Sequence, residues 1–201
     1  MKNFTILLLT IIFTACSANK KIIESEKQIQ EPVIDKVEMK VEEKVIKVTA
    51  KKDASGHLSG IANKQSFADP SFKPWFDSKY NTYITDKETI SKLTEALKGY
   101  TIKGFMGTWC GDSKRGVPRF YKILDQTGFD QNNFELITVG RNKKTPDNLQ
   151  EGFNLIRVPT FIFFKNGKEV GRYVERPRET LEKDILKIVT NQPYKHSYDK
   201  S

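Results

Sequence analysis

Strand and helix patterns alternate along most of this 201-residue chain, and the alternation constrains the fold more than any other feature. A helical pattern starts near Thr85, where Thr85 and Glu88 have capping-box spacing, and it stops at Gly99. Strands joined through a helix should be parallel, whereas the Asn166-Gly167 turn predicts an antiparallel hairpin. The order therefore predicts an α/β fold with a central mixed β-sheet flanked by helices. Strands are expected at 100–106, 134–139, 160–164 and 169–174, and further helices between residues 113 and 128, at 146–153 and from Pro177 onward.

The chain has only two cysteines, Cys16 and Cys110, and two histidines, His57 and His196. Two cysteines far apart in sequence exclude a disulfide-stapled mini-protein and a zinc site built from paired CxxC motifs. Two histidines leave little for a His-rich metal centre. We expect no metal site and no cofactor. A Cys-His hydrolase is disfavoured because His57 lies in the charged N-terminal stretch and His196 in a polar tail, so neither is a convincing general base.

Residues 1–15 have the layout of an export signal, with a basic start, an apolar run from Phe4 to Phe13 and small residues before a cysteine. The run is too short to span a bilayer, which needs about 20 residues. The segment that ends at Cys16 resembles a bacterial lipobox, although Phe13 stands where that motif usually has Leu. The resemblance implies acylation of Cys16 and a lipid-anchored, extracytoplasmic protein of the bacterial cell envelope. The alternative is an ordinary cleaved signal with an incidental cysteine.

Residues 16–60 are expected to form a lipidated N-terminus and a flexible charged tether. The stretch 17–60 contains nine lysines and eight acidic residues but no aromatic residue. Such a composition does not bury enough apolar surface to offset the entropy of ordering the chain. The domain is therefore expected at 61–201, with an aromatic-rich N-terminal extension over 67–84 that packs on it as irregular structure or short turns.

Residues 61–201 carry a net charge of about +7. A basic face of this kind can attract nucleic acid, anionic lipid or acidic partners. An exported chain rarely meets nucleic acid, and the sequence lacks aromatic-basic interleaving of the RNA-binding kind. We therefore expect no nucleic-acid partner, and the simplest interpretation is a solvated basic face.

Cys110 lies in the turn 107–113, between a buried strand and the start of a helix. Unpaired backbone N–H groups at a helix start favour a thiolate over a thiol. Lys114 and Arg115 add positive charge, while Asp112 opposes it. This context favours a reactive cysteine over the alternative of a small buried apolar residue.

The motif Trp109-Cys110-Gly111-Asp112-Ser113-Lys114 resembles the WCGxCK signature of the thioredoxin family. A second match, Val158-Pro159-Thr160, precedes a strand, and in that family the proline is cis and packs against the reactive cysteine. The resemblance covers roughly residues 85–190 and implies a thioredoxin-like three-layer fold. It assigns catalysis to Cys110 and supporting roles to six neighbours: Trp109, Gly111, Asp112, Ser113, Val158 and Pro159.

Two positions depart from the family pattern. Ser113 replaces the second cysteine of CxxC, and Gly104 stands where the family often keeps a buried acid. Cys110 can then attack a disulfide, but Ser113 cannot resolve the mixed disulfide and at most donates a hydrogen bond to the thiolate. Turnover would require an external thiol.

Three functions remain open at this point. The leading one is monothiol exchange or isomerisation of client-protein disulfides, or removal of a small-molecule thiol adduct, with an external reductant and a membrane anchor. The second is a redox-inactive binding or assembly module. The third, a cysteine peroxidase, is disfavoured because Gly107 stands where peroxide-reactive families commonly have Thr, and Thr108 lies one residue too late.

Overall fold

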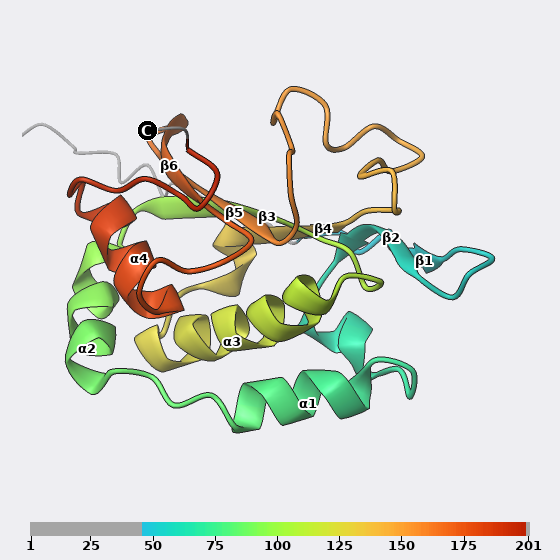
Figure 1. Cartoon of the computed structure of the whole chain (residues 1–201), viewed down its shortest axis with the longest axis horizontal. Coiled ribbons are helices and arrows are strands. Elements are labelled where there is room, and N and C mark those ends of the chain that lie inside the picture. The colour runs from blue at the N-terminus through green and yellow to red at the C-terminus, as the bar shows by residue number, and fades with distance from the viewer. Residues whose placement is uncertain (1–45, 200–201) are drawn as a thin grey trace, which may run out of the picture. The chain divides into compact units, whose positions relative to one another are not determined.

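The computed structural model describes residues 46–199 (Figure 1). A six-stranded sheet has the strand order β1-β2-β4-β3-β5-β6. Its strands are β1 Lys51–Lys52, β2 Leu58–Ala62, β3 Tyr100–Met106, β4 Phe134–Thr138, β5 Thr160–Lys165 and β6 Lys168–Val174. The α-helices are α1 Lys73–Asn81, α2 Lys87–Ala96, α3 Gly111–Thr127 and α4 Leu181–Val189, and two short 3₁₀ helices cover Lys64–Ala68 and Gln131–Asn133.

The sheet is mixed, as predicted. β3 and β4 are parallel because α3 connects them, and Ile102 pairs with Phe134 at the start of the register. β5 pairs antiparallel with β3 and forms the predicted hairpin with β6 through Asn166 and Gly167, which both have positive φ. The α/β class with a mixed sheet and flanking helices is therefore confirmed.

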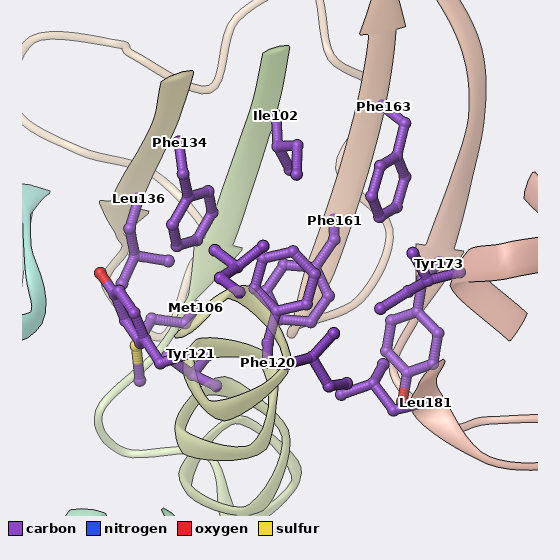
Figure 2. Close-up of a cluster of buried hydrophobic side chains, with 14 of the residues drawn as sticks. Ile102, Met106, Phe120, Tyr121, Phe134, Leu136, Phe161, Phe163, Tyr173 and Leu181 are labelled. Carbon is purple, nitrogen blue, oxygen red and sulfur yellow. The ribbon is translucent and has the colours of Figure 1, made fainter. Parts of the chain in front are cut away.

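One face of the sheet carries the main core, and the four α-helices lie on this side (Figure 1). Phe120 of α3 stacks on Phe161 of β5 with ring centroids 3.9 Å apart, and Phe134 meets Phe120 edge-on (Figure 2). Burying each such ring contributes about 1.5–3 kcal/mol before the entropic cost of ordering. This packing fixes α3, and therefore Cys110 at its start, against the sheet.

The opposite face is covered by a loop over residues 140–157 and has a smaller apolar cluster around Phe105, Ile137 and Ile162. The helix predicted at 146–153 is absent. Thr145 starts one turn by accepting a hydrogen bond from Leu149 N, but Asn148 has a φ of 52°, which a right-handed helix does not allow. The third layer of the fold is thus irregular.

The prediction of a flexible tether is wrong for residues 46–60, which contain β1 and the start of β2. β2 pairs antiparallel with β4, with Gly60 opposite Thr138, and buries Leu58 and Ala62. Gly60 is required because its φ is 122° and a Cβ there would lie 2.9 Å from Ala50 Cα. Charge composition misled the prediction, since the strand is held by backbone pairing with β4. The rest of the predicted tether, and the signal and Cys16, lie outside the described residues.

The aromatic-rich stretch 67–84 is more regular than predicted. Pro74 lies in the first turn of α1, where a missing N–H breaks no hydrogen bond. The ring of Phe76 stacks on that of Phe67 with centroids 5.0 Å apart, and its centroid lies 5.9 Å from that of Tyr121 in α3. The aromatic residues thus bind α1 to the domain.

Two helix starts differ from the sequence prediction. Asp86, not Thr85, caps α2 by accepting a hydrogen bond from Thr89 N at 2.8 Å. α4 starts at Leu181 with Thr180 as its N-cap, not at Pro177. Among the described residues, no helix is long and apolar enough to cross a membrane.

Candidate active site

Cys110 is the N-cap residue of α3 and is half-buried. Its backbone is extended, with φ −91° and ψ 125°, so the chain turns from the end of β3 into the helix at this residue. Cys110 N donates to Gly107 O at 2.9 Å, which closes the turn. The thiol donates to Val158 O at 3.3 Å, and this contact brings the start of α3 to the start of β5.

The Val158–Pro159 peptide bond is cis, as the motif predicts. Pro159 O accepts a hydrogen bond from Glu175 N at 2.7 Å, which ties the end of β6 to this segment. The Pro159 ring lies against Gly116 on α3, where an added Cβ would be 3.0 Å from Pro159 Cγ. Cys110, Val158 and Pro159, separated by about 50 residues, are therefore brought together by α3 and β5.

Trp109 lies back over the end of β3 and does not project freely into solvent. Its indole Nε1 donates to Val139 O at 2.9 Å. A Cβ on Gly107 would lie 2.4 Å from the indole, so only glycine fits beneath the ring. Trp109 and Cys110 pack together against the smaller apolar cluster, so Trp109 forms one wall beside the sulfur.

Asp112 is paired with arginines and is not a free negative charge beside the sulfur. Arg115 forms an ion pair with its carboxylate, and Arg176 Nη2 lies 4.0 Å from Asp112 Oδ2. Gly111, between Cys110 and Asp112, is exposed and has no atom within 4 Å of an added Cβ. The side of Cys110 next to Gly111 is thus open to a substrate.

Comparisons with known proteins agree with this geometry. Residues 75–187 match a family model described as "Thioredoxin". The chain belongs to the thioredoxin family. The thioredoxin of Malassezia sympodialis is 33% identical over 102 residues, which cover 51% of this chain and 92% of that protein. "Thioredoxin-like protein R548" of Acanthamoeba polyphaga mimivirus is 29% identical, with 51% of this chain and 72% of that protein covered.

A solved structure supports the fold alone. A crystal structure described as an HIV epitope-scaffold superposes with a TM-score of 0.51 at 14% identity and covers 66% of this chain and 94% of its own. Family membership supports thiol–disulfide chemistry as the general function of this thioredoxin-like site.

Ser113, in the place of the second cysteine of the thioredoxin motif, is fully buried. Its Oγ accepts a hydrogen bond from Gly107 N at 3.2 Å, and no hydrogen bond to Cys110 is recorded within residues 46–199. The hydrogen bond that Ser113 could donate to a Cys110 thiolate is thus not formed in this structure. Ser113 instead holds the turn that precedes Cys110.

Thr108 belongs to the site and was not predicted. It is 1% exposed, and its Oγ1 accepts a hydrogen bond from Leu58 N at 3.1 Å. The contact fastens the first residue of β2 to the turn before Cys110. Its only sequence signal was a polar residue two positions after a buried strand, and its partner Leu58 lay in a segment expected to be a tether.

Within residues 46–199, neither His57 nor His196 forms a hydrogen bond or ion pair with Cys110. His196 lies beside Asp199 in the C-terminal segment, where burial lowers the pKa of its imidazole. No group of three or more His, Cys, Asp or Glu side chains with metal-binding geometry occurs in residues 46–199.

Proposed function

We propose that this thioredoxin-family protein performs monothiol thiol–disulfide exchange through Cys110. One observation carries the proposal: Cys110 is half-buried at the start of α3, and its sulfur lies 3.3 Å from Val158 O, beside Pro159. An accessible thiol at a helix N-terminus reacts as the thiolate with a disulfide.

In the proposed step the Cys110 thiolate attacks one sulfur of a substrate disulfide. A new S–S bond forms to Cys110 Sγ, the substrate S–S bond breaks, and the other substrate sulfur leaves as a thiolate. Ser113 has no thiol to displace the product. An external thiolate must then attack the mixed disulfide. Attack on the substrate sulfur releases the Cys110 thiolate and forms a disulfide between the substrate and the external thiol. Attack on Cys110 Sγ releases the substrate thiolate and leaves the external thiol bound to Cys110.

The missing second thiol makes the proposal testable in cells. A mixed disulfide on Cys110 should persist until an external thiol arrives, so non-reducing electrophoresis after rapid acid quenching should show adducts. These should disappear on reduction and in Cys110→Ser. A chain whose Cys110 stays unmodified, while its thiol reacts readily with an alkylating agent after purification, contradicts the exchange function.

A second function is favoured by the packing at the two departures from the thioredoxin motif. The space beside Gly104 is filled by Phe134 and Leu136, so a buried acid has no room there, and Ser113 is committed to Gly107. A redox-inactive binding module would keep this packing. Its partners and cellular phenotype should survive in Cys110→Ser, whereas the exchange function requires their loss.

We also propose export as a lipoprotein of the bacterial cell envelope, acylated at Cys16. The supporting pattern is a basic start, the apolar run Phe4–Phe13 and the cysteine that follows Ala15. Labelling with an alkyne fatty acid should mark the full chain and not Cys16→Ser. Cys110→Ser is the control and should retain the label, and unlabelled full chain contradicts acylation.

A further inference from the structure

Four arginines contact or adjoin the residues that flank Cys110, and we call them the arginine rim. Arg115 and Arg176 contact the carboxylate of Asp112. The guanidinium of Arg141 lies 5.5 Å from the ring centroid of Trp109. Arg157 directly precedes Val158, whose carbonyl accepts the Cys110 thiol hydrogen bond. The rim is formed by Arg115, Arg141, Arg157 and Arg176.

Two members of the rim have no acidic partner. Arg141 and Arg157 are exposed, and neither takes part in an ion pair recorded within residues 46–199. Each is positioned by an aromatic ring instead, Arg141 by Trp109 and Arg157 by Tyr198, with the guanidinium 5.2 Å from the Tyr198 centroid. A cation–π contact of this kind restrains a guanidinium and does not use its N–H donors, which stay available for a carboxylate.

Within residues 46–199, the ion pairs of the rim arginines go to one carboxylate, that of Asp112, and Glu175 next to Arg176 is engaged with Tyr198. Asp112 is shared by Arg115 and Arg176, and Glu175 accepts a hydrogen bond from Tyr198 OH. The four arginines carry more positive charge than these two carboxylates offset. The Debye length at 0.1 M salt is about 10 Å, so this charge acts on an approaching group at close range.

We propose that the preferred substrates of Cys110 are disulfides with carboxylates next to the reactive sulfur, which the arginine rim attracts and binds. This inference rests on the proposed function. The source is either an acidic segment of a polypeptide or a small acidic disulfide, because both present the same chemistry. Arg141 and Arg157 provide charge-assisted, bidentate hydrogen bonds, and the rim as a whole raises the encounter rate.

The test uses the reduced full chain and three peptide disulfides that share one reactive cystine and differ only in flanking Glu, Gln or Lys. In stopped-flow measurements, the rate of mixed-disulfide formation should be highest for the Glu peptide, intermediate for the Gln peptide and lowest for the Lys peptide. The Glu peptide should react about tenfold faster than the Lys peptide at low salt. The difference should shrink at high salt. The double variant Arg141→Gln with Arg157→Gln should lose most of the preference.

The matched control removes two positive charges at the other end of β3. Lys98 precedes the first residue of β3, and Lys168 lies in the hairpin whose Lys165 pairs with Tyr100. Lys98→Gln with Lys168→Gln should therefore keep the preference of the wild-type chain. If this control variant lost the preference for the acidic peptide, the preference would come from the overall charge of the protein, and the assignment to the rim would be overturned.

The outcomes separate the two proposals. Equal rates for all three peptides overturn the substrate class and leave exchange through Cys110 intact. Failure to react with any peptide, although alkylation shows a free Cys110 thiol, overturns the exchange function itself. Oxidised glutathione provides the small acidic disulfide, and a faster rate with it than with the Glu peptide assigns the source to small disulfides.

Discussion

The phenyl ring of Phe134 occupies the space that a side chain at residue 104 would need. A Cβ added to Gly104 would lie 2.8 Å from Phe134 Cε2 and 3.0 Å from Leu136 Cδ1. Both neighbours belong to β4, which pairs with β3 and faces α3. The glycine is thus part of the core packing under the Cys110 helix, and the acid of the usual family pattern is excluded by volume.

Gly104→Ala should therefore destabilise the protein. Overpacking a well-filled core costs about 1–3 kcal/mol, because Phe134 must leave its position against Phe120. The free energy of unfolding from urea titration measures the change. Gly111→Ala is the control, since an added Cβ at that site meets nothing within 4 Å. Equal stability of the two variants would show that the ring of Phe134 moves aside freely.

Ser113→Cys should restore a resolving thiol. Residues 110 and 113 are three apart at the start of α3, a spacing that places side chains on one helix face. The lifetime of the Cys110 mixed disulfide should fall sharply. After oxidation the two thiols should form an internal disulfide, so neither should react with Ellman's reagent. Sulfur is a weaker acceptor for Gly107 N, so stability should fall by about 0.5–1.5 kcal/mol.

Ser113→Ala is the matched variant for this experiment. It removes the hydrogen bond to Gly107 but adds no thiol, so its mixed disulfide should persist as in the wild-type chain. A short adduct lifetime in Ser113→Ala would instead mean that the buried hydroxyl, and not the absent thiol, controls release.

Local patterns predicted the four strands β3 to β6 and the position of Cys110 at a helix start, because each depends on neighbours in sequence. The hairpin followed from Asn166-Gly167, and the helix end at Gly128, where φ is 65°, followed from the need for a left-handed residue. The cis Val158–Pro159 bond followed from the resemblance to a family motif.

The predictions that the structure corrects concern features that depend on contacts with other parts of the chain or on the conformation of a single residue. β2 is a strand because β4 supplies its partners, and nothing in a charged stretch shows which edge is available. Ser113 bonds backward to Gly107 because the turn leaves that N–H without a partner, a competition that the motif does not reveal. The loop at 146–153 has the composition of a helix start, but Asn148 takes a left-handed conformation.

Thr108→Val should loosen β2. Valine keeps the shape of threonine but leaves Leu58 N without an acceptor in a buried position, which costs about 1–3 kcal/mol. Hydrogen exchange at the Leu58 amide should accelerate more than at Ile102 in the central strand β3. Thr101→Val is the control because Thr101 is exposed on β3, and its change should stay within about 0.5 kcal/mol. Unchanged exchange at Leu58 would mean that pairing with β4 alone holds the strand.

The contact of Lys52 with Asp69 should make the attachment of β1 depend on pH. Lys52 Nζ lies 2.8 Å from the Asp69 carboxylate, and the hydrogen bond from Lys52, followed by that from Ser71 N, lowers the pKa of Asp69 from 3.8 to about 2. A carboxyl whose folded-state pKa is lowered stabilises the fold above its unfolded pKa, and this contribution is lost as pH falls through the folded value. Wild type should therefore be more stable than Asp69→Asn at neutral pH, and the difference should shrink between pH 3.8 and about 2.

Urea titrations across this pH range measure the difference in the free energy of unfolding. Asp147→Asn is the control because Asp147 is exposed and forms no hydrogen bond recorded within residues 46–199. A difference that stays constant down to about pH 2 would assign the effect of Asp69→Asn to lost packing and not to the charge.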